Sequence, residues 1–374
     1  MTKTLPSNVT ALPSRPGPTR VSSARYINED FLNQEINQVF KRAWLAACPA
    51  HKLRRKGGYM VLDEIGESVI VIRDGSGEIR AFHNSCRHRG SRLVDGRGRL
   101  GQIKCPYHDW RYELDGKLKS IPRADGFDCL DTKNLNLREV RTARWAGFIW
   151  VNFDDDAPPL LDTLSGVEEE LKPYELEDMR AVQTFERIVP CNWKVMLENA
   201  MDFYHVSVVH SASVSRHVDT GPDLRSYGDH TRQRLEIATY AWRERLDAAC
   251  SRGGPYTALQ RSALHKYLLF PNFLINVLPY HVTVMQPFPI DAQTCRLRYA
   301  FCRRKGSRGI ELARVLGTLA ASRYILWEDI KIIQRFQEGV STGRVTEQFF
   351  HDEEGAGAHF HGVLDRWMGV GGVE

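Results

Sequence analysis

The stretch CRHRGSRLVDGRGRLGQIKCPYH, residues 86–108, holds two cysteines and two histidines in an interleaved order. Its first part places Cys86 two residues before His88, and its second part places Cys105 three residues before His108. Side chains of these types at such close spacing predict a metal site in this part of the chain. The order in which they follow one another indicates which metal the site suits.

Zinc is the first candidate, because tetrahedral sites of two cysteines and two histidines are common. Zinc fingers, however, usually place a close pair of cysteines before a pair of histidines, which are about three to five residues apart on a helix. Here each loop supplies one cysteine and one histidine. This order suits a cluster of two irons, in which one iron takes both thiolates and the other takes both imidazoles. The pattern therefore favours a two-iron cluster over zinc.

The spacing C-x-H-x16-C-x2-H, with Pro-Tyr in the second loop, resembles the Rieske [2Fe-2S] motif. The resemblance implies that Cys86 and Cys105 bind one iron, and that His88 and His108 bind the other. Imidazoles in place of two thiolates lower the negative charge of such a cluster and raise its reduction potential.

The composition is that of an ordinary globular protein, with 374 residues, 42% hydrophobic and 26% charged. This length allows two domains with substantial cores. The formal net charge of +5 is too small to predict a nucleic-acid partner. The sequence shows neither the long apolar run of a membrane helix nor the apolar core of a signal peptide, so we expect no membrane partner and a cytoplasmic location.

Two kinds of pattern divide the chain after residues 1–24, a stretch rich in Pro, Ser and Thr that predicts a mobile N-terminal arm. A helix is expected over Asn28–Trp44, and short strands separated by turns predict an antiparallel β domain up to about Phe153. Beyond the link DDDAPP (154–159), segregated strands and helices predict an α+β domain with an antiparallel sheet. Strand-like runs occur at 182–189, 233–241, 267–278, 281–288 and 295–303, and helical periodicity occurs at 193–206 and 309–338.

A second metal site is suggested by CNWKVMLENAMDFYHVSVVH, residues 191–210. His205 and His210 are five residues apart, which places them about 140° apart on a regular helix. Both can bind one metal only if the helix ends, loosens or bulges between them. The β-branched Val206, Val208 and Val209 are compatible with such an irregularity.

A third ligand is expected on the helix that contains RYILWEDIKIIQRFQEG. Asp329 falls inside the apolar stripe of this helix, where a carboxylate is costly unless it is paired or bound to a metal. Glu328 falls instead with Lys331 and Arg335, which predicts a solvated ion pair. We therefore take Asp329 as the ligand. His205, His210 and Asp329 would form a 2-His-1-carboxylate triad, which suits non-haem Fe(II).

Because it combines the cysteine and histidine motif with the predicted triad, the chain resembles the Rieske non-haem iron oxygenases, specifically their catalytic alpha subunits, over nearly its full length. The resemblance is carried by four motifs: CRH…CPYH, NWK-x3-EN-x2-D-x-YH-x4-H, FPNFLIN at 270–276, and WED-x7-Q with Asp329 and Gln337. It implies an antiparallel-β Rieske domain inserted in a helix-grip (START-like) catalytic domain with a central antiparallel sheet. The Rieske domain would span residues 41–155, and residues 25–40 and 156–374 would form the catalytic domain with the mononuclear iron.

The resemblance also implies a role for Asp202. Members of the family assemble head-to-tail, so a homotrimer is expected, and an assembly of three alpha and three beta subunits stays open. His108 of one subunit would then meet Asp202 of the next, and Asp202 would hydrogen-bond the ligand His205. Asp202 would thereby bridge the electron path between subunits.

The expected activity is O2-dependent hydroxylation of a small organic substrate, with electrons from NAD(P)H delivered by a separate reductase, possibly through a ferredoxin. Mono- or cis-dihydroxylation of an aromatic ring stands first. The alternative is oxidative N- or O-dealkylation, or hydroxylation, of a quaternary ammonium compound or a methyl ether. A non-catalytic Rieske electron carrier is a third interpretation, which the length of the chain and the second iron site disfavour.

Overall fold

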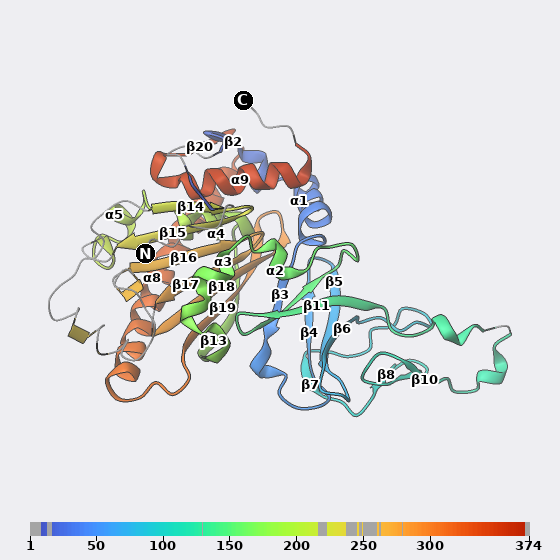
Figure 1. The fold of residues 1–374 in the computed structure, drawn as a ribbon. Helices are drawn as coiled ribbons and strands as arrows, with labels where there is room; N and C mark the ends of the chain where they lie inside the picture. Colours follow the sequence, from blue (N-terminus) through green and yellow to red (C-terminus); the bar gives the residue numbers. More distant parts are fainter. Residues whose placement is uncertain are drawn as a thin grey trace. The chain divides into compact units, whose positions relative to one another are not determined.

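The computed structural model describes residues 9–12, 17–128, 130–215, 223–236, 245–246, 249, 260–261, 263–278 and 280–370 (Figure 1). The chain forms two compact units. One is Lys41–Ala157, and the other joins Met1–Phe40 to Pro158–Glu374. The first contains the cysteine and histidine motif, and the second contains the predicted triad.

The first unit is made of antiparallel strands, as the turn-rich sequence predicts. A seven-stranded sheet has the order β3-β12-β11-β6-β5-β4-β7, and a three-stranded sheet has the order β10-β9-β8. The strands are β3 (Leu45–Pro49), β4 (Gly58–Glu64), β5 (Glu67–Arg73), β6 (Ile79–His83), β7 (Arg97–Arg99), β8 (Ile103–Lys104), β9 (Arg111–Tyr112), β10 (Leu118–Ser120), β11 (Glu139–Trp145) and β12 (Phe148–Asn152). Cys86 and Cys105 lie in one buried cluster with Trp110 and Tyr112.

The second unit is built on an eight-stranded antiparallel sheet with the order β1-β14-β15-β16-β17-β18-β19-β13. Together with the antiparallel first unit, it confirms the predicted α+β class. The strands are β1 (Val9–Ala11), β13 (Met179–Val189), β14 (Asp223–Tyr227), β15 (His230–Glu236), β16 (Ala263–Leu269), β17 (Phe273–Leu278), β18 (His281–Asp291) and β19 (Thr294–Arg304). A separate ribbon pairs β2 (Arg20–Ser22) with β20 (Glu347–Phe349).

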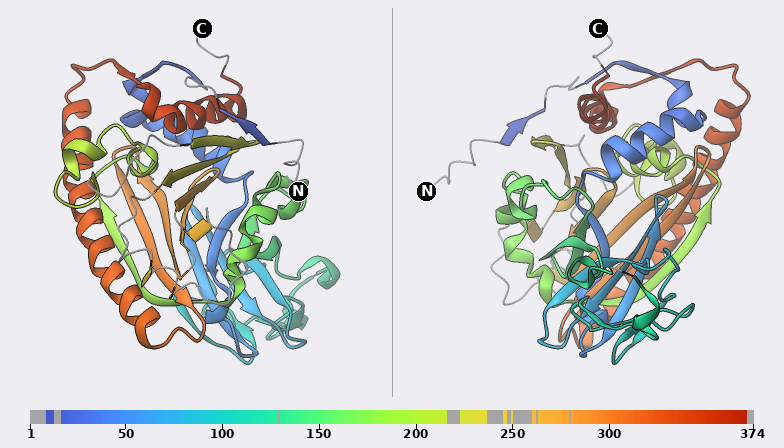
Figure 2. Two further views of the ribbon diagram at one scale, coloured as in Figure 1. Left: turned by 60° about the vertical axis from the view of Figure 1, so that its left-hand side comes forward. Right: turned by 90° about the vertical axis from the view of Figure 1, so that its right-hand side faces the viewer.

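Helices lie on both faces of this sheet (Figure 2). One face carries α4, which packs on β16, β18 and β19 and contacts α8 and α9. The other face contacts the short α2–α3 segment, where Glu170 accepts hydrogen bonds from Tyr227 and Tyr267. The helices are α1 (Glu29–Glu35), α2 (Leu160–Thr163), α3 (Val167–Leu171), α4 (Trp193–Met201), α5 (Val206–Val209), α8 (Gly309–Ser341) and α9 (Gly355–Met368). None of the helices in the described ranges combines the length and the apolar character that crossing a lipid bilayer requires.

Several local features differ from the sequence-based expectations. In the segment 1–24, expected as a mobile arm, Val9–Ala11 pairs with β14 and Arg20–Ser22 pairs with β20, while residues 1–8 and 13–16 lie outside the described residues. The expected strand 267–278 is two strands, β16 and β17, because a turn at Phe270-Pro271 interrupts it. The first helix ends at Glu35 and continues as the π-helical segment Ile36–Phe40.

Two more differences concern the expected strand 233–241 and helix α9 near the C-terminus. Residues 237–241 of the expected strand 233–241 lie outside the described residues. Helix α9 was not predicted, although its buried face includes His359 and His361. The segment GAGAHFHG places small residues among the apolar ones, and this obscures the helical period that the sequence pattern relies on.

Candidate metal centres

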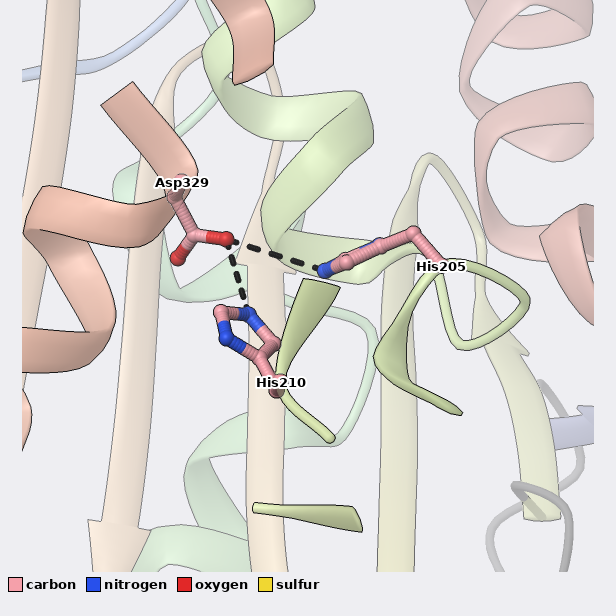
Figure 3. A group of neighbouring side chains, drawn as sticks. All are labelled: His205, His210 and Asp329. Atoms are coloured by element: carbon pink, nitrogen blue, oxygen red, sulfur yellow. Dashed lines mark hydrogen bonds and ion pairs between the residues drawn. The ribbon is translucent and has the colours of Figure 1, made fainter. Parts of the chain in front are cut away.

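The structure brings His205, His210 and Asp329 together (Figure 3). One possible ligand atom from each lies within 4.8 Å of the others. Asp329 Oδ1 is 2.9 Å from His210 Nε2 and 3.6 Å from His205 Nε2. Asp329 comes from α8, and the two histidines flank the single turn of α5. Three side chains from two distant parts of the sequence thus converge on one point.

The chain leaves the helical path at two places near the histidines, one of them expected from the sequence. Helix α4 ends at Met201, and Asp202 has an extended backbone with φ −74° and ψ 135°. His205 then caps the start of α5, and His210 caps its end. One interruption therefore precedes His205, and the other is the end of α5 at Val209, between the two histidines, as expected. The expected continuous helix over 193–206 is wrong because of the first interruption.

Each histidine is also held at its second ring nitrogen by a carboxylate. His205 Nδ1 lies 2.8 Å from Asp202 Oδ2, and His210 Nδ1 lies 2.9 Å from Glu328 Oε2. Ser213 donates a further hydrogen bond of 2.8 Å to the same oxygen of Glu328. An imidazole whose Nδ1–H donates to a carboxylate keeps its Nε2 lone pair free for a metal.

Glu328 is therefore placed differently from the solvated ion pair that the sequence predicts. Its side chain is only 12% exposed, because it turns toward His210 and Ser213 instead of toward Lys331 and Arg335. A sequence pattern indicates on which face of a helix a residue lies, but it does not show whether another segment of the chain covers that face. The segment that ends α5 covers this part of α8, and it converts an expected surface charge into a partner of His210.

The electrostatics of the triad fit a bound cation. Burial lowers the pKa of His205, but its hydrogen bonds to Asp202 and Asp329 outweigh burial and raise the pKa to about 9. The pKa of His210 is also raised, since the hydrogen bonds to Asp329 and Glu328 outweigh its burial. Carboxylates that raise the pKa of both imidazoles favour a positive charge at this point, which a bound metal cation would supply. Two nitrogens and one carboxylate oxygen are the donor set that suits non-haem Fe(II).

The NWK motif fixes the start of α4 inside the unit. Asn192 caps the helix by accepting from Lys194 N, and its own backbone N–H donates to Gln337 Oε1 at 2.8 Å. Gln337 lies on α8, two turns after Asp329 in the WED-x7-Q motif, and also donates to Tyr26 O. These bonds lock the register between α4 and α8, so they set the position of the histidines relative to Asp329.

A buried ion pair holds the same helix from the other side. Lys194 Nζ lies 2.7 Å from Glu35 Oε1, and neither side chain is exposed. Trp193 Nε1 donates to the second oxygen of Glu35 at 2.9 Å. Sequence reasoning did not find Glu35, because its partners are 158 residues away or more. The EN part of the motif also has a structural partner, since Tyr26 donates to Glu198 at 3.0 Å.

The four residues of the first motif lie in two loops of the β unit. Cys86 and Cys105 are 3% and 4% exposed, and the rings of His88 and His108 have centroids 4.7 Å apart. Trp110 stacks on His88 with centroids 4.9 Å apart, whereas His108 is exposed and is stacked by Tyr107. The arrangement has a protected cysteine side and a histidine that faces solvent.

Three observations show that these loops fit a cluster. His88 Nδ1 is buried and has no hydrogen-bond partner, which is the state of a nitrogen that lacks its ligand. Burial raises the pKa of the Cys86 thiol, whereas the backbone N–H groups of Tyr107 and His108 outweigh burial and lower the pKa of Cys105. Tyr112 Oη lies 3.3 Å from Cys86 Sγ, so a polar donor faces the sulfur.

Two family models match the chain in agreement with this geometry. The model "Rieske [2Fe-2S] domain" matches residues 43–136, and the model "Ring hydroxylating alpha subunit (catalytic domain)" matches residues 176–370, slightly more than half of the chain. The chain belongs to the ring-hydroxylating oxygenase alpha subunits. It is thus a Rieske-type oxygenase, an oxidoreductase whose cofactors are a [2Fe-2S] cluster and non-haem iron. Members of this family work with a separate reductase.

Relatives of this oxygenase are known by activity and by structure. It is 26% identical to the carnitine monooxygenase oxygenase subunit of Escherichia coli (strain K12), with 96% of each chain covered. It is 36% identical to the glycine betaine monooxygenase oxygenase subunit of Pseudomonas aeruginosa over 50% of this chain and 43% of the relative. The solved structure of a quaternary ammonium Rieske monooxygenase superimposes with a TM-score of 0.80 at 23% identity, covering 96% of this chain and 99% of that one. This last likeness confirms the predicted fold.

Proposed function

We propose that the two metal centres are held by the residues that the sequence singles out. The domains are a Rieske domain over residues 41–155 and a catalytic domain formed by residues 25–40 and 156–374. The mononuclear iron ligands are His205, His210 and Asp329, and the cluster ligands are Cys86 and Cys105 on one iron and His88 and His108 on the other. The convergence of the triad within 4.8 Å and the unpartnered His88 Nδ1 support these assignments.

The iron, when bound, supplies the activation of O2. The chain's own residues supply orientation: Asp202 and Glu328 hold the imidazoles, so that both Nε2 atoms point to Asp329. Glu328 is not a ligand, because it contacts the Nδ1 edge of His210, away from the edge that faces the triad.

The reaction is monooxygenation of a quaternary ammonium compound. One oxygen atom of O2 enters a C–H bond beside the nitrogen, and the other leaves as water with two electrons and two protons. Where an N-methyl group is attacked, the resulting N-hydroxymethyl group breaks down to formaldehyde, a tertiary amine and a proton. The observation that carries this proposal is the match to a carnitine monooxygenase subunit over 96% of both chains. The 36% match to a glycine betaine monooxygenase subunit points to the same class of substrate.

Hydroxylation of an aromatic ring, as part of aromatic compound catabolism, is the second candidate. The catalytic family model, described as ring hydroxylating, favours it. The two reactions differ in their products, since ring hydroxylation adds oxygen to the substrate and N-demethylation removes a carbon as formaldehyde.

Electron delivery is proposed to cross between subunits of a homotrimer, with three alpha and three beta subunits as the alternative. Two observations support this proposal: His108 is exposed, and Asp202 and His205 line a pocket. A separate reductase, with or without a ferredoxin, reduces the cluster from NAD(P)H. The location proposed for this assembly is the cytoplasm.

A panel of quaternary amines, methyl ethers and aromatic acids tests the function. The purified oxygenase is reduced by a surrogate reductase while O2 uptake, formaldehyde and product mass are measured. Formaldehyde release coupled to O2 uptake with a quaternary amine is the expected result. A product that gains oxygen on an aromatic ring, with uncoupled uptake for every amine, would replace this proposal by the second candidate.

A further inference from the structure

A row of polar side chains crosses the sheet beneath α4. Gln233, Lys266, Asn276 and Thr283 stand on four successive strands, and each is paired in register with the next. Directly paired residues share one face of an antiparallel sheet. The four side chains therefore form one continuous row on a single face from β15 to β18. Asn276 Nδ2 donates to Thr283 Oγ1 at 2.9 Å within this row.

The row lies on the face that carries the triad. Gln233 Nε2 donates to Met201 O at 2.9 Å, and Lys266 Nζ donates to Ala200 O at 2.8 Å. These are the last carbonyls of α4, immediately before Asp202. The neighbouring Tyr267, whose side chain points to the opposite face, contacts Glu170 instead.

Several polar groups of this row lack hydrogen-bond partners among the described residues. An ammonium group has three donors, and within the described ranges the Ala200 carbonyl is the acceptor that Lys266 reaches, with no carboxylate within 4.0 Å of Nζ. Gln233 Oε1 and Asn276 Oδ1 are buried and have no partner. Among the described residues, Lys266 is thus a half-buried cation that lacks a counter-ion, and it lies beside two unpaired carbonyl oxygens. Such groups are costly unless a ligand supplies the missing partners.

The pKa of Lys266 depends on its burial and on the charges near the row. Burial lowers the pKa of Lys266, while the carboxylates of Asp329 and Asp202 oppose this effect. The charges of Asp329 and Asp202 thus affect the pKa of Lys266, although neither carboxylate forms an ion pair with the lysine. A bound carboxylate would provide Lys266 with the direct counter-charge that the described residues do not supply.

We propose that Lys266 binds a carboxylate group of the substrate, with the amides of Gln233 and Asn276 beside it. The inference rests on the proposed function and deepens it. The cationic end of a quaternary ammonium substrate cannot lie against Lys266, because like charges repel. The substrate is therefore a zwitterion whose carboxylate lies at Lys266 and whose ammonium end lies away from it. A simple cation or a hydrocarbon leaves the row unpaired.

Two matched pairs of compounds test this proposal. Glycine betaine and choline differ by a carboxylate in place of a hydroxymethyl group, and so do benzoate and benzyl alcohol. Binding of all four to the holoenzyme is measured by titration calorimetry, and turnover is measured with the surrogate reductase. The variants are Lys266→Met, which removes the charge, and Lys266→Arg, which keeps it. Lys305→Met, which alters an exposed lysine, is the control.

The expected result is preferential binding of the carboxylate member of a pair. Lys266→Met lowers this affinity by about 10- to 100-fold, as expected for loss of a hydrogen bond to a charged group, and leaves the alcohol member unchanged. Lys266→Arg keeps most of the preference, and Lys305→Met keeps all of it. Iron content and the visible spectrum of the cluster verify that each variant is intact.

The outcomes separate the inference from the proposed function. If Lys266→Met weakens both members of a pair equally, or if neither carboxylate binds the wild type, the carboxylate site is wrong and Lys266 only caps α4. If glycine betaine is turned over independently of Lys266, the proposed function stands and the inference fails. If benzoate alone binds, and does so through Lys266, the carboxylate site stands, whereas the zwitterionic substrate and the quaternary ammonium function fail.

Discussion

Replacement of Glu328 by glutamine should weaken the mononuclear iron site without touching a ligand. The carboxylate lies 2.9 Å from His210 Nδ1, and their side chains are 12% and 4% exposed, so the interaction is shielded from water. Loss of such a partner behind a histidine ligand typically lowers metal affinity by about 10- to 100-fold. Glutamine keeps an acceptor oxygen and loses the charge, so we expect about 10-fold for Glu328→Gln. Alanine removes both, so we expect about 100-fold for Glu328→Ala, or about 2.7 kcal/mol.

The assay is competition for Fe(II) between the oxygenase and a chelator. The visible absorption of the [2Fe-2S] cluster serves as an internal standard, since Glu328 belongs to the other metal centre. Glu338→Gln, on the exposed side of the same helix, is the matched control. Ser213→Ala should fall between the wild type and Glu328→Gln, because Ser213 only anchors the carboxylate.

Two results would refute this reasoning. Unchanged Fe(II) affinity in Glu328→Ala would show that the carboxylate does not hold His210 in the loaded site. Complete loss of iron in Glu328→Ala, together with retention in Asp329→Ala, would mean that the ligand and its neighbour have been exchanged.

Three further predictions follow from the same structure. Asp202→Asn should leave the cluster spectrum and iron content unchanged and sharply lower product formation; normal turnover would contradict its bridging role. Lys194→Met should lower the free energy of unfolding by about 3–5 kcal/mol, because it leaves Glu35 charged and buried, and the double variant with Glu35→Leu should recover most of this loss in urea titrations. Burial lowers the pKa of both His265 and His281 to about 3. The unfolded chain therefore binds protons below about pH 6.5 that the folded state rejects, and stability falls by about 2 kcal/mol for each histidine between pH 7 and 5; a flat urea midpoint over this range would contradict it.

Local spacing was sufficient to predict much of the fold class and to propose the residues of both candidate sites. The interleaved cysteines and histidines required no knowledge of distant contacts, because each loop carries its own pair. The alternation of the strands and the stripe of α8 are likewise local properties. Asp329 could be singled out because a carboxylate on an apolar face needs a specific partner.

What could not be predicted depends on segments that meet from far apart in the sequence. Arg20–Ser22 forms a strand because it pairs with Glu347–Phe349. This partner lies more than 300 residues later, so the local sequence does not reveal it. Glu328 and Asp329 are adjacent on α8, yet both reach His210, since its ring presents one nitrogen to each. A helical wheel places neighbouring residues about 100° apart and assigns them to different environments. It cannot show that one imidazole spans both.

The charges around the triad set a second condition on the substrate. Asp202, Glu328 and Asp329 surround the two imidazoles, and Glu198 and Glu354 line the same pocket as Asp202 and His205. An ammonium group is favoured beside these carboxylates and repelled by a protonated Lys266, whereas a carboxylate group is favoured at Lys266 and repelled by the acidic side chains. A zwitterion meets both conditions when its carboxylate lies at Lys266 and its ammonium end lies toward the acidic part of the site.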